Sequence, residues 1–263
     1  MLNRLLDCIV KPRFIGKYHS DSFFKVLLTI FIFFCLYMGI LAMRCFNSDY
    51  FSNDDSRLVA SIVVQYGGND ISYNSLENKI EGDTYIYKGE VFNLVVLPAE
   101  NYNYDLNAIN IVLHEDHSQI VFYGVVVSNV QYQNLNIESF DFNAVANNDF
   151  TNTYNFCNLI SLTLQSSNAV FQAMDFFQKG MTNLILLVVI ALLCYFAISK
   201  IVNPSIDRDV RLKLVMYDAC IFFVALMFAE MLNVAFLEYF GIILPGIYTY
   251  ITFKHIVKVV IRR

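Results

Sequence analysis

Long uncharged apolar runs alternate with polar stretches along this chain, and the runs lie towards its two ends. Val26–Met43 is 18 residues without a charge, about 27 Å as a helix and close to the roughly 30 Å of bilayer hydrocarbon. Met181–Ile198 is a second such run. From Leu214 to Phe253 the chain is apolar over about 40 residues, twice what one crossing needs, so we divide it at Glu230–Asn233. The pattern predicts four transmembrane helices.

The predicted fold class is an α-helical integral membrane protein with a β-rich (α+β) extracytoplasmic domain between its first and second transmembrane helices. A cleaved signal peptide is the alternative for the first run, but a long basic segment precedes it and no small-x-small cleavage site follows, which favours an uncleaved anchor. The expected segments are a cytoplasmic segment at 1–22, helix one at 23–44, the outer domain at 45–178, helix two at 179–199, a cytoplasmic loop at 200–211, helices three and four at 212–230 and 234–253, and a basic tail at 254–263.

Basic residues near the ends of the apolar runs set the expected orientation. Sixteen of the 23 acidic residues lie between Arg44 and Lys179, together with only five of the 18 basic ones. An acidic outer domain disfavours a nucleic-acid partner. We therefore expect a cell-membrane protein with both termini in the cytoplasm. In that orientation the remaining basic residues all lie on the cytoplasmic side: Arg4, Lys11, Arg13, Lys17, Lys25, Lys200, Arg208, Arg211, Lys213, Lys254, Lys258, Arg262 and Arg263.

The segment ahead of the first run repeats apolar residues at helical spacing. Leu2, Leu5, Leu6 and Ile9 precede Pro12, with basic residues between and after them. This pattern favours a short amphipathic helix on the inner leaflet. A basic leader that only sets the topology is the alternative.

The outer domain is predicted to be mostly β. Leu58–Tyr66, Thr84–Leu97, Ile109–Leu113 and Gln119–Val127 are rich in β-branched residues, and the polar segment His114–Ser118 joins the last two as a hairpin. Thr84–Leu97 is expected to give one or two strands, bending at Lys88–Glu90 in the latter case. After a polar, turn-like stretch at 147–155, helical spacing returns from Val170, so the second membrane helix is expected to begin outside the bilayer.

Few residues are candidates for chemistry. His114 and His117 are weak metal-ligand candidates, but a zinc-protease helix needs histidines four apart on one face, and these are three apart between strands. Cys45 and Cys157 both lie outside, where a disulfide is possible. No nucleophile elbow or phosphate loop is present. We therefore expect a non-enzymatic protein with no cofactor.

Ionisable residues within the membrane are functional candidates because burying them in hydrocarbon is costly. The candidates are Asp218, Glu230, Asn233 and Glu238, and Asp218 stands about two turns into its helix. A hydrogen bond or ion pair that fixes helix packing is one interpretation of Asp218, and an ion or proton pathway is the other.

The order of segments resembles a family of membrane proteins of unknown function from low-G+C Gram-positive bacteria, some described as maltodextrin-utilisation membrane proteins. The resemblance rests on Cys8–His19 (CIVKPRFIGKYH), on the outer insert, and on Arg211–Ile256 with Tyr217 and Leu244-Pro245. The polar turn Glu115–Ser118 departs from the glycine-containing turn of the family. The resemblance implies a link to sugar uptake and carries no catalytic residues with it.

Three functions remain open from the sequence. The first is a non-enzymatic membrane protein whose outer domain binds a ligand or a partner, such as a transporter or another envelope protein. The second is a small oligomeric transporter or channel component that uses Asp218. The third is an envelope or nutrient sensor that relays to a partner.

Overall fold

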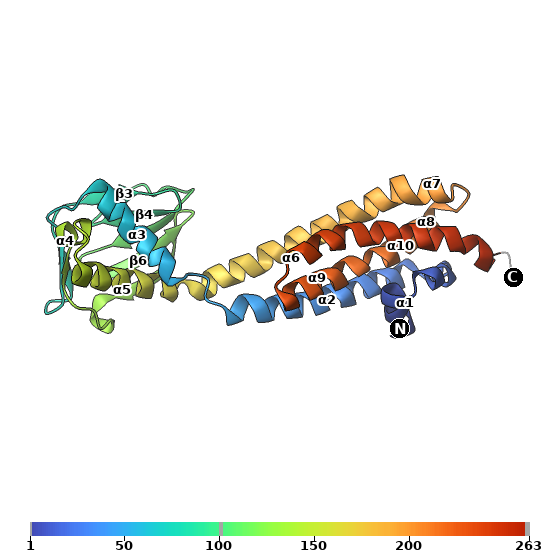
Figure 1. The fold of residues 1–263 in the computed structure, drawn as a ribbon, viewed down its shortest axis with the longest axis horizontal. Coiled ribbons are helices and arrows are strands. Elements are labelled where there is room, and N and C mark those ends of the chain that lie inside the picture. Colours follow the sequence, from blue (N-terminus) through green and yellow to red (C-terminus); the bar gives the residue numbers. More distant parts are fainter. Residues whose placement is uncertain (1, 100–101, 261–263) are drawn as a thin grey trace. The chain divides into compact units, whose positions relative to one another are not determined.

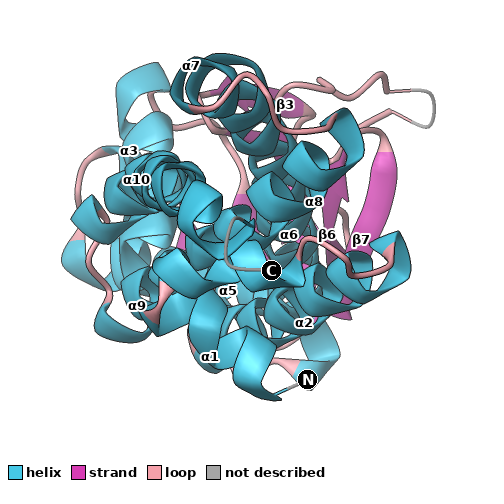
Figure 2. Cartoon of the chain, turned by 90° about the vertical axis from the view of Figure 1, so that its right-hand side faces the viewer, coloured by secondary structure: helices cyan, strands magenta, loops and turns pink. Residues whose placement is uncertain are grey.

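The computed structural model describes residues 2–99 and 102–260, which form two compact units. One unit, Met1–Asn47 with Met174–Arg263, consists of helices and loops; the other, Ser48–Ala173, contains every strand of the described residues. Figure 1 shows β3, β4 and β6 in the same unit as the helices labelled α3, α4 and α5, and Figure 2 colours strands magenta and helices cyan. The expected basic tail is described only in part, because Arg262 and Arg263 lie outside the described residues.

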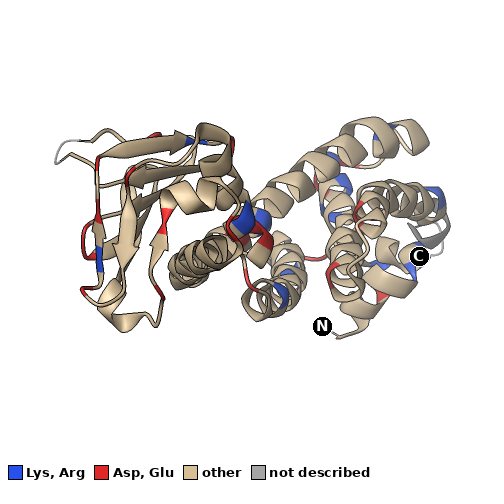
Figure 3. Ribbon diagram, turned by 60° about the vertical axis from the view of Figure 1, so that its left-hand side comes forward, with Lys and Arg blue, Asp and Glu red and all other residues tan. Residues whose placement is uncertain are grey.

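Four helices of the described chain are long and apolar enough to cross a membrane: Phe23–Asn47, Asn168–Val202, Arg208–Leu232 and Phe236–Ile256. Long stretches of these helices carry neither acidic nor basic residues (Figure 3). The helical elements are α1 (Leu2–Val10), the 3-10 helix η1 (Pro12–Tyr18), α2 (Phe23–Asn47), α6 (Asn168–Leu193), the π-helical turn η3 (Cys194–Ser199), α7 (Lys200–Val202), α8 (Arg208–Ala219), α9 (Ile221–Leu232) and α10 (Phe236–Val260).

The four predicted spans overlap the four long helices, but α6 begins at Asn168, ahead of the expected start at 179. The last two candidate spans separate at Asn233, which adopts the left-handed conformation (φ 52°) that commonly ends a helix. The break predicted at Glu230–Asn233 is therefore confirmed. The second span starts at Asn168, so the prediction that its helix begins well before the apolar run is confirmed as well.

The third candidate span is the centre of the helical unit. The most apolar window of Arg208–Leu232 is 72% buried, against 28%, 22% and 28% for the other three. Both α2 and α10 pack against α9, and η3, which continues α6, packs against α8. Three helices therefore surround one central helix and turn most of their own apolar surface outwards.

The Ser48–Ala173 unit is an α+β domain with two sheets. Its elements are α3 (Asn53–Tyr66), β1 (Ser72–Asn74), β2 (Lys79–Glu81), β3 (Tyr85–Lys88), β4 (Phe92–Val96), β5 (Ile109–Leu113), β6 (His117–Phe122), β7 (Val125–Gln131), η2 (Tyr132–Asn134), β8 (Phe140–Asp141), α4 (Phe142–Ala146) and α5 (Phe150–Ser166). The larger sheet has the order β3-β4-β5-β6-β7, antiparallel except for the parallel β4–β5 pair. The smaller has the order β2-β1-β8.

Two layers of apolar side chains hold the larger sheet in place. On one face Leu94, Ile111 and Ile120 join the buried residues of α3 and α5 in the main core. On the other face Val95, Val112 and Val121 form a small cluster with Tyr102 and Tyr104 packed against it. Both faces of the central strands are therefore covered, which explains why β4 and β5 are buried at every position.

The strand predicted at Leu58–Tyr66 is wrong: these residues belong to helix α3. The backbone N–H and the hydroxyl of Ser52 both donate to the carboxylate of Asp55, at 2.7 and 3.0 Å, which stabilises the first turn. Val59 and Val63, four residues apart, then bury one helical face in the core. The cap and the buried face outweigh the β propensity of the branched residues.

In the same domain, the hairpin between Ile109–Leu113 and the next strand is confirmed, and so is the bend at Lys88–Glu90. Two other predictions need correction. The segment Gln119–Val127 is two strands, because Tyr123 and Gly124 (φ 49° and 74°) form a tight turn inside it. The stretch 147–155 is turn-like only to Asp149, whose carboxylate accepts the Asn152 N–H and starts α5.

Candidate functional site

Asp218 lies on α8 in the middle of the helical unit and is completely buried. Its Oδ1 is 2.7 Å from Thr252 Oγ1 on α10, and the same hydroxyl is 3.0 Å from the carbonyl oxygen of Pro12. Oδ2 has no hydrogen-bond partner. The carboxyl group therefore links two helices and the N-terminal segment through one threonine.

The hydrogen bonds around Asp218 indicate the protonation state of its carboxyl group. Thr252 has one hydroxyl hydrogen but two acceptors, Asp218 and Pro12. Both contacts are full hydrogen bonds when Asp218 carries a proton and donates to Thr252, which then donates to Pro12. A neutral carboxylic acid also removes the cost of a buried charge with no cation beside it. The geometry thus favours the packing interpretation of Asp218.

The N-terminal segment is fastened to the helical unit by a network of polar contacts. Arg4 donates two hydrogen bonds to Asp21, at 2.8 and 2.9 Å, and Tyr217 donates a third at 2.8 Å. Burial would raise the pKa of Asp21, but these donors outweigh burial and lower it. The hydroxyl of Tyr248 donates to the carbonyl oxygen of Ile9 at 2.5 Å. The segment is folded against the helices, and α1 and the far end of α10 lie at the same end of this unit (Figure 1).

The amphipathic helix predicted at the N-terminus is confirmed as α1. Leu5 and Ile9 pack against the helical unit, whereas Leu2 and Leu6 are exposed. Asp7, also on α1, is buried, forms an ion pair with Lys17 and accepts a hydrogen bond from the Tyr18 hydroxyl at 2.6 Å. Burial would raise the pKa of Asp7 as well, yet Lys17 and Tyr18 lower it.

Glu230, Asn233 and Glu238 lie at the opposite end of the helical unit from this network. Arg44, at the end of α2, forms an ion pair with Glu230 and donates to Asn233 Oδ1 at 2.7 Å. Glu238 is exposed on the first turn of α10. None of the three lies beside Asp218, so the structure does not unite the four intramembrane candidates in one site.

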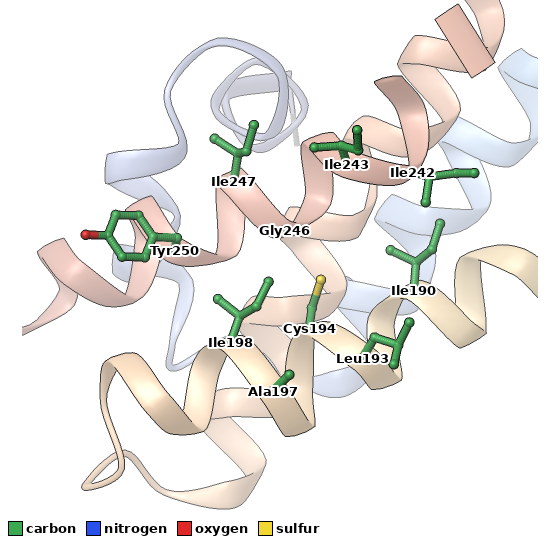
Figure 4. Close-up of a pocket in the computed structure, with 10 residues that line it drawn as sticks. All are labelled: Ile190, Leu193, Cys194, Ala197, Ile198, Ile242, Ile243, Gly246, Ile247 and Tyr250. Carbon is green, nitrogen blue, oxygen red and sulfur yellow. The ribbon is translucent and has the colours of Figure 1, made fainter. Parts of the chain in front are cut away.

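An apolar groove runs between the end of α6 with η3 and the middle of α10 (Figure 4). It has a volume of about 560 Å³. Gly246 leaves space on one wall, and Cys194 and the ring of Tyr250 are among the few lining residues that are not aliphatic. The groove offers shape and apolar contact, and its lining contains no charged side chain.

The histidine pair lies in the hairpin between β5 and β6. The rings of His114 and His117 stack with centroids 4.4 Å apart, and His117 Nδ1 is 2.6 Å from Asp116 Oδ1. Burial lowers the pKa of His114. Within residues 2–99 and 102–260, no three His, Cys, Asp or Glu side chains converge as a metal site requires. The arrangement is that of a hairpin turn stabilised by ring stacking.

The two cysteines of the possible disulfide, Cys45 and Cys157, belong to different units of the structure. The Cys45 thiol lies 3.6 Å from the carboxylate of Asp175, and the Cys157 thiol lies 3.8 Å from the carbonyl oxygen of Ser56. Both thiols are free in the structure, and the disulfide stays a prediction.

Strand β7 is the edge of the larger sheet and was missed as a candidate site. β6 is its strand neighbour on one side, and no described strand pairs with the other side. Val125 and Val126 are exposed on it, and Tyr123 is exposed in the turn before it. The sequence VVVSNVQ contains neither Lys nor Pro, the residues that commonly protect sheet edges.

Comparison with known proteins does not assign the chain to a family. No family model, no curated protein and no solved structure matches it.

Proposed function

We propose that this chain is a multi-pass membrane protein, with both termini in the cytoplasm, that displays Ser48–Ala173 outside the cell membrane as a recognition domain and performs no catalysis itself. The outward apolar surface of three of the four long helices supports insertion, because large apolar patches are rare on soluble monomers. The basic residues at one end of the helical unit support the orientation.

The observation that carries the recognition role is the open edge of β7. An unprotected edge strand offers a row of backbone N–H and C=O groups to an extended segment of another protein. Val125 and Val126 are exposed, and burying their apolar side chains against a partner would stabilise the complex. We therefore propose that a partner protein of the envelope or a transporter adds a strand to β7. A role in sugar uptake would identify the partner as a sugar transporter.

The packing of Asp218 supports this role over a solute pathway. Its carboxyl group bridges α8, α10 and Pro12, and it does not line the groove of Figure 4. A pathway residue would face water or an ion along a channel.

Site-specific photo-crosslinking in native membranes tests the proposed edge. A benzophenone amino acid at Asn129, exposed on β7, is expected to capture one defined protein. The same probe at Leu76, which is 92% exposed in the β1–β2 turn, is the matched control and is expected to capture none. The double substitution Val125→Lys and Val126→Lys should abolish capture at Asn129, since charged side chains protect edges. Equal capture at both positions, or capture unaffected by the lysines, would refute strand addition.

A further inference from the structure

A polar cavity of about 700 Å³ lies where the second candidate span ends and the third begins. Its walls come from η3, the start of α7, the loop at 203–207 and the first turn of α8. The π-helical turn at Cys194–Ser199 widens the helix there. Tyr195 and Phe196 of this turn line the polar cavity, whereas Cys194 of the same turn lines the apolar groove.

Arg211 is the buried cation of this cavity. It is 4% exposed, and its Nη2, whose two hydrogens are shared among three acceptors, lies 3.2, 3.1 and 3.0 Å from the carbonyl oxygens of Asn203, Pro204 and Ile206. Its Nε–H is buried with no acceptor, and no carboxylate of the described chain forms an ion pair with it. A buried guanidinium with an unused donor and no counter-charge is costly, and an anion in the cavity would remove that cost.

Two further cations line the same cavity. Lys200 and Arg208 are exposed, and neither takes part in a salt bridge within the described residues. The one carboxylate of the lining, Asp207, accepts the backbone N–H of Arg208 at 2.9 Å as the cap of α8. Three cations and one carboxylate leave the cavity with two positive charges.

We propose that this cavity binds a phosphate-bearing anion, namely the headgroup of an anionic phospholipid. Guanidinium and ammonium groups are the usual protein ligands of phosphate, and basic pockets between membrane helices hold anionic headgroups. Lys200 follows directly on the apolar run of the second span, where a headgroup would lie. The lipid source of the phosphate rests on the membrane insertion proposed above, whereas the anion site does not.

Thermal unfolding of the full-length protein in a neutral maltoside detergent tests the site. Three probes are titrated: short-chain phosphatidylglycerol, phosphatidylcholine with the same chains, and inorganic phosphate. Phosphatidylglycerol is expected to raise the unfolding temperature saturably, and phosphatidylcholine to leave it unchanged. Substituting Lys200→Gln and Arg208→Gln together should raise the half-saturating phosphatidylglycerol concentration on the order of tenfold or more, since each such cation contributes about fivefold.

The matched control removes two exposed cations at the same end of the helical unit, Lys11→Gln with Arg13→Gln. It should leave the titration unchanged. Arg211→Gln should remove the shift altogether; if that variant does not fold, the Lys200 and Arg208 pair still decides the result. A shift as large with inorganic phosphate as with phosphatidylglycerol would support the anion site with a free phosphate as occupant.

Three results would overturn the proposal. They are an equal shift with phosphatidylcholine, an unchanged titration in the Lys200 and Arg208 variant, and no shift with any probe. None of them depends on strand β7 or on a partner protein. Recovery of the chain in the soluble fraction of lysed cells would instead refute membrane insertion, and the phosphate titration would still test the cavity.

Discussion

Substitution of Asp218 separates packing from transport, and the structure sets the expected size of each effect. Asp218→Asn keeps an acceptor beside Thr252 and adds an N–H that replaces the proton of the neutral acid, so the free energy of unfolding should change by less than about 0.5 kcal/mol. Asp218→Ala removes the contact and should cost roughly 1–2 kcal/mol, near the upper end for hydrogen bonds between membrane helices. Thr252→Val removes the hydroxyl that contacts both Asp218 and Pro12 and should cost roughly 1–3 kcal/mol.

Denaturation in mixed micelles, followed by circular dichroism, measures these free energies. The double variant Asp218→Ala with Thr252→Val completes a cycle, and a coupling energy near zero would mean that the two side chains do not interact. An Asp218→Asn variant as unstable as Asp218→Ala would refute the neutral-acid arrangement. A stable Asp218→Asn variant that has lost its cellular function would refute the packing role and favour an ion or proton pathway.

Two more predictions concern other parts of the chain. Asp7 and Asp21 have lowered pKa values in the folded protein, so the stability they contribute is fully present above the ordinary value of 3.8 and is lost as the pH falls below it. The unfolding temperature should therefore fall more steeply below about pH 4 than that of an Asp21→Asn variant, and equal falls would contradict the network. Asp55→Ala removes the cap contact with Ser52 and should cost about 1 kcal/mol in thermal unfolding followed by circular dichroism, and a cost of zero would show that the cap does not stabilise α3.

The apolar spans were predictable because their signal is local. A helix that crosses a bilayer must satisfy its backbone internally over about 20 apolar residues, whatever packs beside it. The start of α6 at Asn168 and the break at Asn233 follow from the same local pattern. In the Ser48–Ala173 unit α3 was missed because many of its apolar residues are β-branched, although Ser52 and Asp55 carry a capping signal three residues apart.

The contacts of the candidate sites were not predictable, since they join residues far apart in the chain. Thr252 is 34 residues from Asp218, and neither helix pattern specifies which hydroxyl will face the carboxyl group. Arg211 was interpreted only as a charge that sets orientation. It is buried because the loop at 203–206 folds back over it and presents three carbonyl oxygens, which depends on tertiary structure.

The depth of Asp218 follows from its distance along the third span to charged groups at either end. Arg211 is seven residues before it, about 10 Å along a helix, and Glu230 is twelve residues after it, about 18 Å. Together these distances come to about 28 Å, close to the hydrocarbon thickness of a bilayer. If Arg211 binds a headgroup and Glu230 pairs with Arg44 at the other surface, Asp218 lies nearer the headgroup side than the midplane. Pro12 reaches it there, so a polar segment can share its hydrogen bond without crossing the membrane core.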